Sequence, residues 1–147
     1  MSTQIDSVFV YRRRLQCCDG DAAQIGYTSS QLDILLEAVD DWWRHVVGVD
    51  WFELSHERGL GCPCVHVELD FHRPVRPGQE VFVHVHLAAL GRSSMEYKLS
   101  AYDAVGTLSF FGKLVHVLIN GEAPRAISIP EALARPMRAY RERTGYG

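Results

Sequence analysis

Residues 30–47 carry the pattern that most limits how this chain can fold. Apolar side chains recur there at the three- and four-residue spacing of one helix face, with charged residues opposite. Ser30 and Asp33 resemble a capping box, so we expect the helix to begin at Ser30, and Gly48 is expected to end it. A helix with so wide an apolar face must be covered by another layer of structure. The apolar positions are Leu32, Leu35, Leu36, Val39, Trp42, Trp43, Val46 and Val47.

Strands predicted before and after this helix in the sequence can supply that layer. Residues 7–16 are rich in Val, Phe and Tyr, which predicts a strand before the helix, and residues 49–61 are expected to form a short helical or irregular connector. Residues 64–71 then alternate, which predicts a half-buried strand. Its buried face is expected to hold Val65, Val67, Leu69 and Phe71.

Three further strands are expected at 79–90, 94–103 and 107–119, with turns at 91–93 and 104–106. Short connections between sequential strands predict an antiparallel meander. Residues 130–143 are predicted to form a C-terminal helix with proline near its first turn. This order predicts one α+β domain over residues 1–147, in which a curved antiparallel sheet of about five strands wraps a long central helix.

Length and composition argue against several classes of protein. The 147 residues have a net charge of -3 with few clustered cations, so no nucleic-acid partner is expected. No apolar run approaches the roughly 20 residues of a membrane span, and the N-terminal segment lacks the order of a secretory signal, so we expect a cytoplasmic protein without a membrane partner. The four cysteines are not spaced as zinc ligands, and we expect no metal and buried, reduced thiols.

The loop before the helix resembles the signature of the 4-hydroxybenzoyl-CoA thioesterase family, which has the hotdog fold. The family pattern is roughly D-x-D-x-x-G-x-V-x-Y, and residues 19–27 read DGDAAQIGY. Segments around 58–63, 91–94 and 121–127 also resemble that family, so the resemblance covers nearly the whole chain. It implies an acyl-CoA thioesterase that needs no cofactor, because coenzyme A is part of the substrate. Gln24 replaces the family's glycine, so the turn is expected either to avoid a positive φ there, with Gly26 as the candidate to take over the bend, or to accept strain at Gln24.

The same resemblance implies roles for individual residues. The family's catalytic carboxylate falls on Asp21, and its carbonyl-polarising amide falls on Thr28 near the helix start. Thioester hydrolysis needs a nucleophile or base and a donor for the developing oxyanion, and both roles suit this loop. Whether Asp21 attacks directly or activates water stays open, as does a plain turn role for it. The acyl side is expected to include Tyr27, Leu36 and Cys62, and the coenzyme A side Arg92, Ser93 and Arg125.

Leu36 bears on the substrate. In the aryl-hydrolysing member of the family, the matching residue is acidic and contacts a ring hydroxyl. Glu37 lies about 100° further round the helix and is not expected to replace it. The resemblance therefore implies a more apolar pocket for a benzoyl-like, other aryl or medium acyl group, although a plain core role for Leu36 is equally open.

Two functions stay open. One is an acyl-CoA thioesterase; the other is a non-catalytic protein that binds an acyl or coenzyme A ligand, in which Gln24 and the weakly basic turn at 91–94 reflect lost catalysis. A hotdog dehydratase would need a histidine in the site loop, and none lies between Asp19 and Asp41. The resemblance also implies a homodimer or homotetramer, with strands joined edge to edge and sites at the interface.

Overall fold

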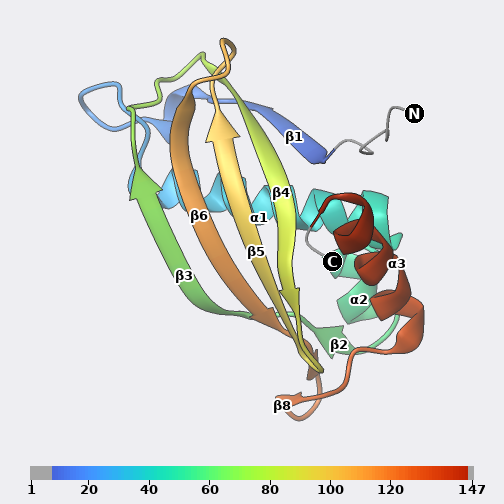
Figure 1. Cartoon of the computed structure of the whole chain (residues 1–147). Coiled ribbons are helices and arrows are strands. Elements are labelled where there is room, and N and C mark those ends of the chain that lie inside the picture. The colour runs from blue at the N-terminus through green and yellow to red at the C-terminus, as the bar shows by residue number, and fades with distance from the viewer. Residues whose placement is uncertain (1–7, 146–147) are drawn as a thin grey trace, which may run out of the picture.

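An antiparallel sheet curves around one long helix in this computed structural model, which describes residues 8–145 (Figure 1). The five strands of the sheet have the order β1-β4-β5-β6-β3, and helix α1 (Thr28–Trp42) lies along the concave face. The strands are β1 (Phe9–Arg14), β3 (Cys64–Phe71), β4 (Glu80–Leu90), β5 (Ser94–Tyr102) and β6 (Leu108–Val117). The predicted sheet and its β4-β5-β6 meander are confirmed, while the expected first residue of the first strand, Ser7, lies outside the described residues.

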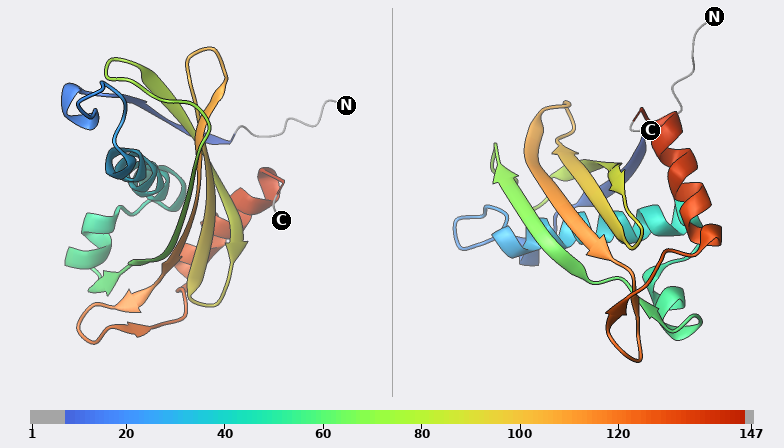
Figure 2. Two further views of the ribbon diagram at one scale, coloured as in Figure 1. Left: turned by 90° about the vertical axis from the view of Figure 1, so that its left-hand side faces the viewer. Right: turned by 60° about the horizontal axis from the view of Figure 1, so that its bottom comes forward.

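Smaller elements join and close this layer. A short helix α2 (Trp51–His56) lies in the connector, and helix α3 (Glu131–Arg143) packs beside the far end of α1 (Figure 2). A second small sheet joins β2 (Leu60–Gly61), β7 (Ile119–Asn120) and β8 (Arg125–Ala126), so the strand expected over 107–119 is interrupted after Val117. None of the helices described between residues 8 and 145 is long and apolar enough to cross a membrane.

Helix α1 begins two residues earlier than the sequence indicated. Its cap is Tyr27 and its first residue is Thr28, so Ser30 lies within the first turn and the expected Ser30–Asp33 capping box does not form. The far end is as predicted: Gly48 has φ 89° and its N–H donates to Trp43 O at 2.8 Å. A π-helical turn, η2 (Trp43–Val47), continues α1 up to that glycine.

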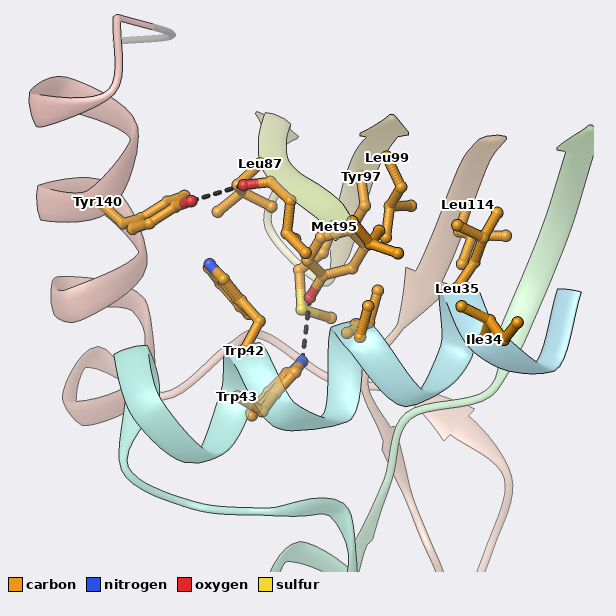
Figure 3. Close-up of a cluster of buried hydrophobic side chains, with 14 of the residues drawn as sticks. Ile34, Leu35, Trp42, Trp43, Leu87, Met95, Tyr97, Leu99, Leu114 and Tyr140 are labelled. Atoms are coloured by element: carbon orange, nitrogen blue, oxygen red, sulfur yellow. Dashed lines mark hydrogen bonds between the residues drawn. The ribbon is translucent and has the colours of Figure 1, made fainter. Parts of the chain in front are cut away.

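The core lies between α1 and the inner face of the sheet. Trp42 and Trp43 are fully buried, and the indole Nε1 of Trp43 donates to the hydroxyl of Tyr97 at 3.0 Å (Figure 3). The inner face of β4 is fully buried, as its alternation predicted. The buried face of the helix also includes residues that the predicted stripe omitted, Gln31, Ile34 and Ala38.

Strand β3 has the predicted bounds, but the prediction that it is half-buried is wrong for most of its apolar face. Val65 is 60% exposed, Val67 43% and Phe71 49%, and only Leu69 is half-buried. The strand is an edge strand that pairs with β6 alone, and of these apolar side chains only Leu69 packs against the core beside α1. Alternation reports which side chains share a face, but it does not report what covers that face.

The cysteines are free thiols, but they are less buried than expected. Cys17 and Cys18 are exposed, and Cys62 and Cys64 are half-buried. Both exposed thiols lie in the 3-10 turn η1 (Cys17–Asp19), on the surface side of the loop that follows β1.

One histidine belongs to the core. His116 on β6 is 1% exposed and stacks on the ring of Trp51 at a centroid distance of 5.3 Å. Burial lowers its pKa to about 4, because the charged imidazolium would lose its hydration. The unfolded chain accepts this proton near pH 6.5, so the folded state loses stability as the pH falls from about 6.5 towards about 4.

We therefore predict that His116→Phe, which keeps the stacked ring and cannot titrate, removes part of this pH dependence. Between pH 7.5 and pH 4.5, wild type should lose up to about 3 kcal/mol more unfolding free energy than the variant. Urea unfolding at the two pH values measures this difference. Equal losses for the two proteins would show that His116 does not stay neutral in the fold.

Candidate active site

Asp19 ties the loop before α1 to the sheet. Its carboxylate accepts hydrogen bonds from Arg13 Nη1 at 2.5 Å and from the backbone N–H of Gln16 at 2.6 Å. The Arg13 guanidinium holds the pKa of Asp19 below its usual range. The backbone oxygen of Asp19 also accepts the N–H of Tyr27 at 2.8 Å, which closes the loop at the helix cap. Asp19 is thus the structural anchor of residues 19–27, and it is 7% exposed.

Asp21 is half-buried in the same loop and uses one of its oxygens to shape it. Its Oδ1 accepts the N–H groups of Ala23 at 2.8 Å and Ile25 at 3.1 Å, and its own N–H donates to Ile25 O at 2.7 Å. Within the described residues no hydrogen bond reaches Oδ2. One oxygen therefore fixes the orientation of the carboxylate and leaves the other for a ligand.

The bend in the loop falls on Gln24, so of the two expected outcomes the strained turn is the one observed, and Gly26 does not take over the bend. Gln24 has φ 60°, the one residue other than glycine with a positive φ in the described chain. Gly26 is needed for another reason: a Cβ there would lie 2.7 Å from Val75 Cγ2, while its N–H donates to Val75 O at 2.7 Å. The loop therefore accepts local strain at Gln24 and packs its backbone against residues 72–78 at Gly26.

The start of α1 opens on a hollow of about 300 Å³. Thr28 is the first helical residue and is exposed, and its N–H has no acceptor four residues back within the helix. The positive end of the helix dipole also points out here, so this amide can polarise a carbonyl. The hollow brings together the loop, the first turn of α1 and the segment that follows β3. Its lining residues are Ile25, Gly26, Thr28, Gln31, Phe71, His72, Arg73 and Pro74.

Two lining features were missed from the sequence. Gln31 is 5% exposed on the buried face of the first turn, and its signal was a polar residue one turn before Leu35 in an apolar stripe. His72 and Arg73 reach the hollow because both of their N–H groups donate to Ser109 O at 2.9 Å. That chain reversal after β3 has no periodic signature in the sequence.

Two residues expected on the acyl side, Tyr27 and Leu36, lie at different places along α1. Tyr27 is 50% exposed at the helix cap, and Leu36 lies two turns further along α1 in a separate hollow of about 330 Å³ that Trp51 also lines. Glu37 is held by β1, because its carboxylate accepts the Tyr11 hydroxyl at 2.9 Å and pairs with Arg13. Its carboxylate is therefore engaged by β1, although Glu37 lines the same hollow as Leu36.

Cys62 is not a nucleophile in this environment. Burial raises the pKa of its thiol to about 12, and its Sγ lies 3.9 Å from Nδ1 of the neutral His116. Such a pair holds no thiolate near neutral pH. Within residues 8–145, no group of three or more His, Cys, Asp and Glu side chains is placed to hold a metal ion.

The residues expected to bind coenzyme A lie at the other end of the sheet. Arg92 and Ser93 form the β4-β5 turn, and Arg125 is exposed on β8. The turn and β8 both lie far from the loop before α1 (Figure 1). Arg92 Nε donates to Ser128 Oγ at 2.7 Å beside a hollow of about 330 Å³ that Arg138 and Arg141 also line. One chain alone therefore does not bring Asp21 and these arginines together.

Comparison with known proteins gives a consistent picture. A family model described as the thioesterase-like superfamily matches residues 14–137. The 1,4-dihydroxy-2-naphthoyl-CoA hydrolase of Rippkaea orientalis is 26% identical over 131 residues, covering 88% of this chain and 94% of that protein. A solved thioesterase-superfamily structure from Jannaschia sp. CCS1 has a TM-score of 0.84 at 28% identity, covering 91% of this chain and 93% of its own.

A 1,4-dihydroxy-2-naphthoyl-CoA thioesterase from Synechocystis has a TM-score of 0.82 at 19% identity, covering 90% of this chain and 96% of its own. These names give a naphthoyl substrate and not the 4-hydroxybenzoyl substrate of the family that the sequence resembled. The expected hotdog fold is confirmed, and the expected family is confirmed at the broader level of the superfamily. The chain belongs to the thioesterase-like superfamily.

Proposed function

We propose that this chain hydrolyses an acyl-CoA thioester, with Asp21 as base or nucleophile and the Thr28 N–H as the donor to the carbonyl oxygen. The observation that carries the proposal is the free amide of Thr28 on a hollow that is also lined by Ile25 and Gly26 of the loop that Asp21 shapes, although Asp21 itself is not a lining residue. Relatives named as thioester hydrolases along nearly the whole chain support it. Asp21 stabilises the turn through Oδ1 alone, which accepts the two backbone N–H groups. Its Oδ2 is therefore available to act on a substrate or a water molecule.

Both chemical routes give the same products. As a base, Asp21 takes a proton from water while the water oxygen attacks the thioester carbon, and the C–S bond then breaks. As a nucleophile, its carboxylate attacks the same carbon, the coenzyme A thiolate leaves, and water hydrolyses the anhydride. In each route the carbonyl oxygen becomes an oxyanion that the Thr28 N–H stabilises. The products are the free acid and coenzyme A with its thiol reprotonated.

The acyl group is proposed to be aromatic or of medium length, with its apolar part towards α1. Leu36 itself offers no carboxylate to a ring hydroxyl. Of the carboxylates that line its hollow, Glu37 is bound to Tyr11 and Arg13, Asp40 accepts the N–H of Trp51, and Asp33 is exposed. The related hydrolase from Rippkaea orientalis is named for a bicyclic aromatic acyl group, which fits this class. Within it, Leu36 favours rings without a hydroxyl opposite the thioester.

A second copy of the chain is proposed to complete the site. The exposed apolar side chains of β3 lie on a strand with one unpaired edge, which suits pairing with another strand. Antiparallel pairing of β3 with its copy places the Phe71 end of one strand beside the Cys64 end of the other. Phe71 lines the Thr28 hollow, and the Cys64 end adjoins the small sheet that carries Arg125, so each copy would supply the other's coenzyme A side.

Substitutions at Asp21 and Thr28 test the chemistry directly. Asp21→Asn should lower kcat by about two or more orders of magnitude, because the amide oxygen can still accept the Ala23 and Ile25 N–H groups but cannot act as a base. Thr28→Pro should lower kcat by about 100-fold, since proline is tolerated at the first helical position but has no N–H to donate. Release of free thiol from a panel of acyl-CoA thioesters measures both.

Thr28→Ala is the matched control, because it keeps the N–H and removes only the exposed side chain. It should retain activity within a few-fold of wild type. Equal rates for Thr28→Pro and Thr28→Ala would remove the amide from the mechanism. Tight binding of acyl-CoA by wild type without thiol release would favour the non-catalytic ligand-binding alternative.

The acyl preference is tested with matched aromatic thioesters. We expect kcat/KM for benzoyl-CoA or a naphthoyl-CoA to equal or exceed that for 4-hydroxybenzoyl-CoA, because Leu36 provides no acceptor for the ring hydroxyl. Leu36→Asp should shift the ratio towards the hydroxylated ring. A wild-type preference of more than tenfold for 4-hydroxybenzoyl-CoA contradicts the apolar pocket.

The shared-site proposal predicts a dimer that depends on β3. Val67→Lys should convert the dimer to a monomer and reduce kcat/KM, since it places a charge on the proposed strand pair. Val105→Lys is the control: Val105 is 86% exposed in the β5-β6 turn, and its replacement should leave the assembly intact. Light scattering during size-exclusion chromatography measures the mass. A monomeric wild type at tens of micromolar would exclude the shared site.

A further inference from the structure

Gln31 is a buried polar side chain that should destabilise the fold, and nothing in the packing of α1 requires a polar residue at this position. It lies in the first turn of α1, 5% exposed, on the face that is otherwise apolar. A Cβ at Gly26 would lie 3.5 Å from its Nε2, so the amide packs closely against the Gly26 backbone. Its Oε1 has no hydrogen-bond partner among the described residues. Burying an unpaired amide oxygen is unfavourable, and an apolar side chain of the same length would avoid it.

The amide nitrogen shows what Gln31 contributes instead. Nε2 donates to the backbone oxygens of Gly26 at 3.0 Å and Tyr27 at 3.3 Å. The backbone N–H of Gln31 donates to the same Tyr27 oxygen at 3.1 Å. Two donors from one residue therefore hold the Tyr27 carbonyl.

That carbonyl and the Thr28 N–H belong to one planar peptide group. Because the group is rigid, fixing the direction of the Tyr27 C=O fixes the direction of the Thr28 N–H on its other side. Donors on the oxygen of a peptide group also polarise it and make its N–H a stronger donor. The opposite orientation of the Gln31 amide would point Oε1 at two carbonyl oxygens, so the side chain has one favourable arrangement.

We infer that Gln31 is a positioning residue that aims and polarises the Thr28 N–H towards the substrate carbonyl. The inference rests on the proposed function and deepens it, because it says how the oxyanion donor is held. Gln31 does not touch the reacting atoms; it acts through the peptide group between Tyr27 and Thr28. This accounts for a buried amide that keeps one oxygen unpaired at the base of the hollow.

Two substitutions test the inference by kinetics. Gln31→Met has a similar length, fits apolar surroundings and cannot donate, so kcat should fall about tenfold or more while KM stays within about twofold. The unfolding midpoint should change by less than about 4 °C, because the lost hydrogen bonds are offset by removal of the unpaired oxygen. A kcat within twofold of wild type, or a loss that follows the unfolded fraction, would overturn the positioning role.

Gln31→Glu supplies a conditional rescue. A protonated carboxyl can donate to the Tyr27 oxygen, and an ionised one cannot, so the ratio of variant to wild-type kcat should fall as the pH rises through the pKa of the new group. Because a buried ionised carboxylate also destabilises the fold, each kcat is taken per folded enzyme, with the folded fraction measured at each pH, and a purely structural role then predicts a constant ratio. Gln31→Met is the control, since its ratio to wild type should not vary with pH.

An independent readout separates this inference from the proposed function. In ¹⁵N-labelled protein, the amide resonance of Thr28 should shift in Gln31→Met, and that of Ser29, whose preceding carbonyl does not bind Gln31 Nε2, should shift less. If wild type releases no thiol from any thioester, the proposed function fails while this shift still tests how the peptide is held. If Thr28→Pro is slow and Gln31→Met is as fast as wild type, the function stands and the positioning role fails.

Discussion

The packing of one face of α1 into the concave side of the sheet is the interaction on which the rest of the structure depends. At Gly112 on β6, a Cβ would overlap Leu35 Cδ1, so the helix approaches the sheet more closely than any other residue would allow. Trp42 and Trp43 extend this contact to the far end of the helix, where Trp43 binds Tyr97. Each fully buried side chain of this kind contributes about 1.5–3 kcal/mol, which fixes the helix against the sheet.

Once α1 is fixed, the chain before it has to end β1 and reach the helix start in a few residues. Asp19 makes this possible, because its carboxylate binds Arg13 on β1 while its backbone oxygen binds the Tyr27 N–H at the cap. The loop between these two points is short and self-bonded, and Asp21 lies in it with one oxygen engaged. The position of the Asp21 carboxylate relative to the helix start therefore depends on the Arg13–Asp19 ion pair, because that pair fixes the short loop that carries Asp21.

Most of the fold could be predicted from the sequence, because periodic burial leaves periodic patterns. Strand β3 has the predicted bounds, the helical segment formed by α1 and η2 ends at Gly48 as predicted, and β4 has the predicted buried face. The burial of β3 was predicted wrongly, since an edge strand and a central strand can share the same alternation. The start of α1 was placed at Ser30, because capping preferences favour serine, whereas the loop geometry set by Asp19 makes Tyr27 the cap.

The candidate site was predictable only through resemblance to a family, and local rules fail there for a physical reason. Gln24 adopts a positive φ that glycine would favour, Gln31 buries an unpaired oxygen, and Tyr27 caps a helix without a side-chain hydrogen bond. Each departure lowers stability slightly, and all three lie within eight residues. Their shared consequence is a short, rigid loop that leaves the Thr28 N–H and one oxygen of Asp21 without partners in the described residues. A cap such as serine or aspartate at position 27 would accept hydrogen bonds from the first-turn N–H groups with its side-chain oxygen and so compete with a substrate carbonyl for them. The lack of a capping side chain at position 27 therefore weakens the helix start and also leaves its N–H groups free to bind a ligand.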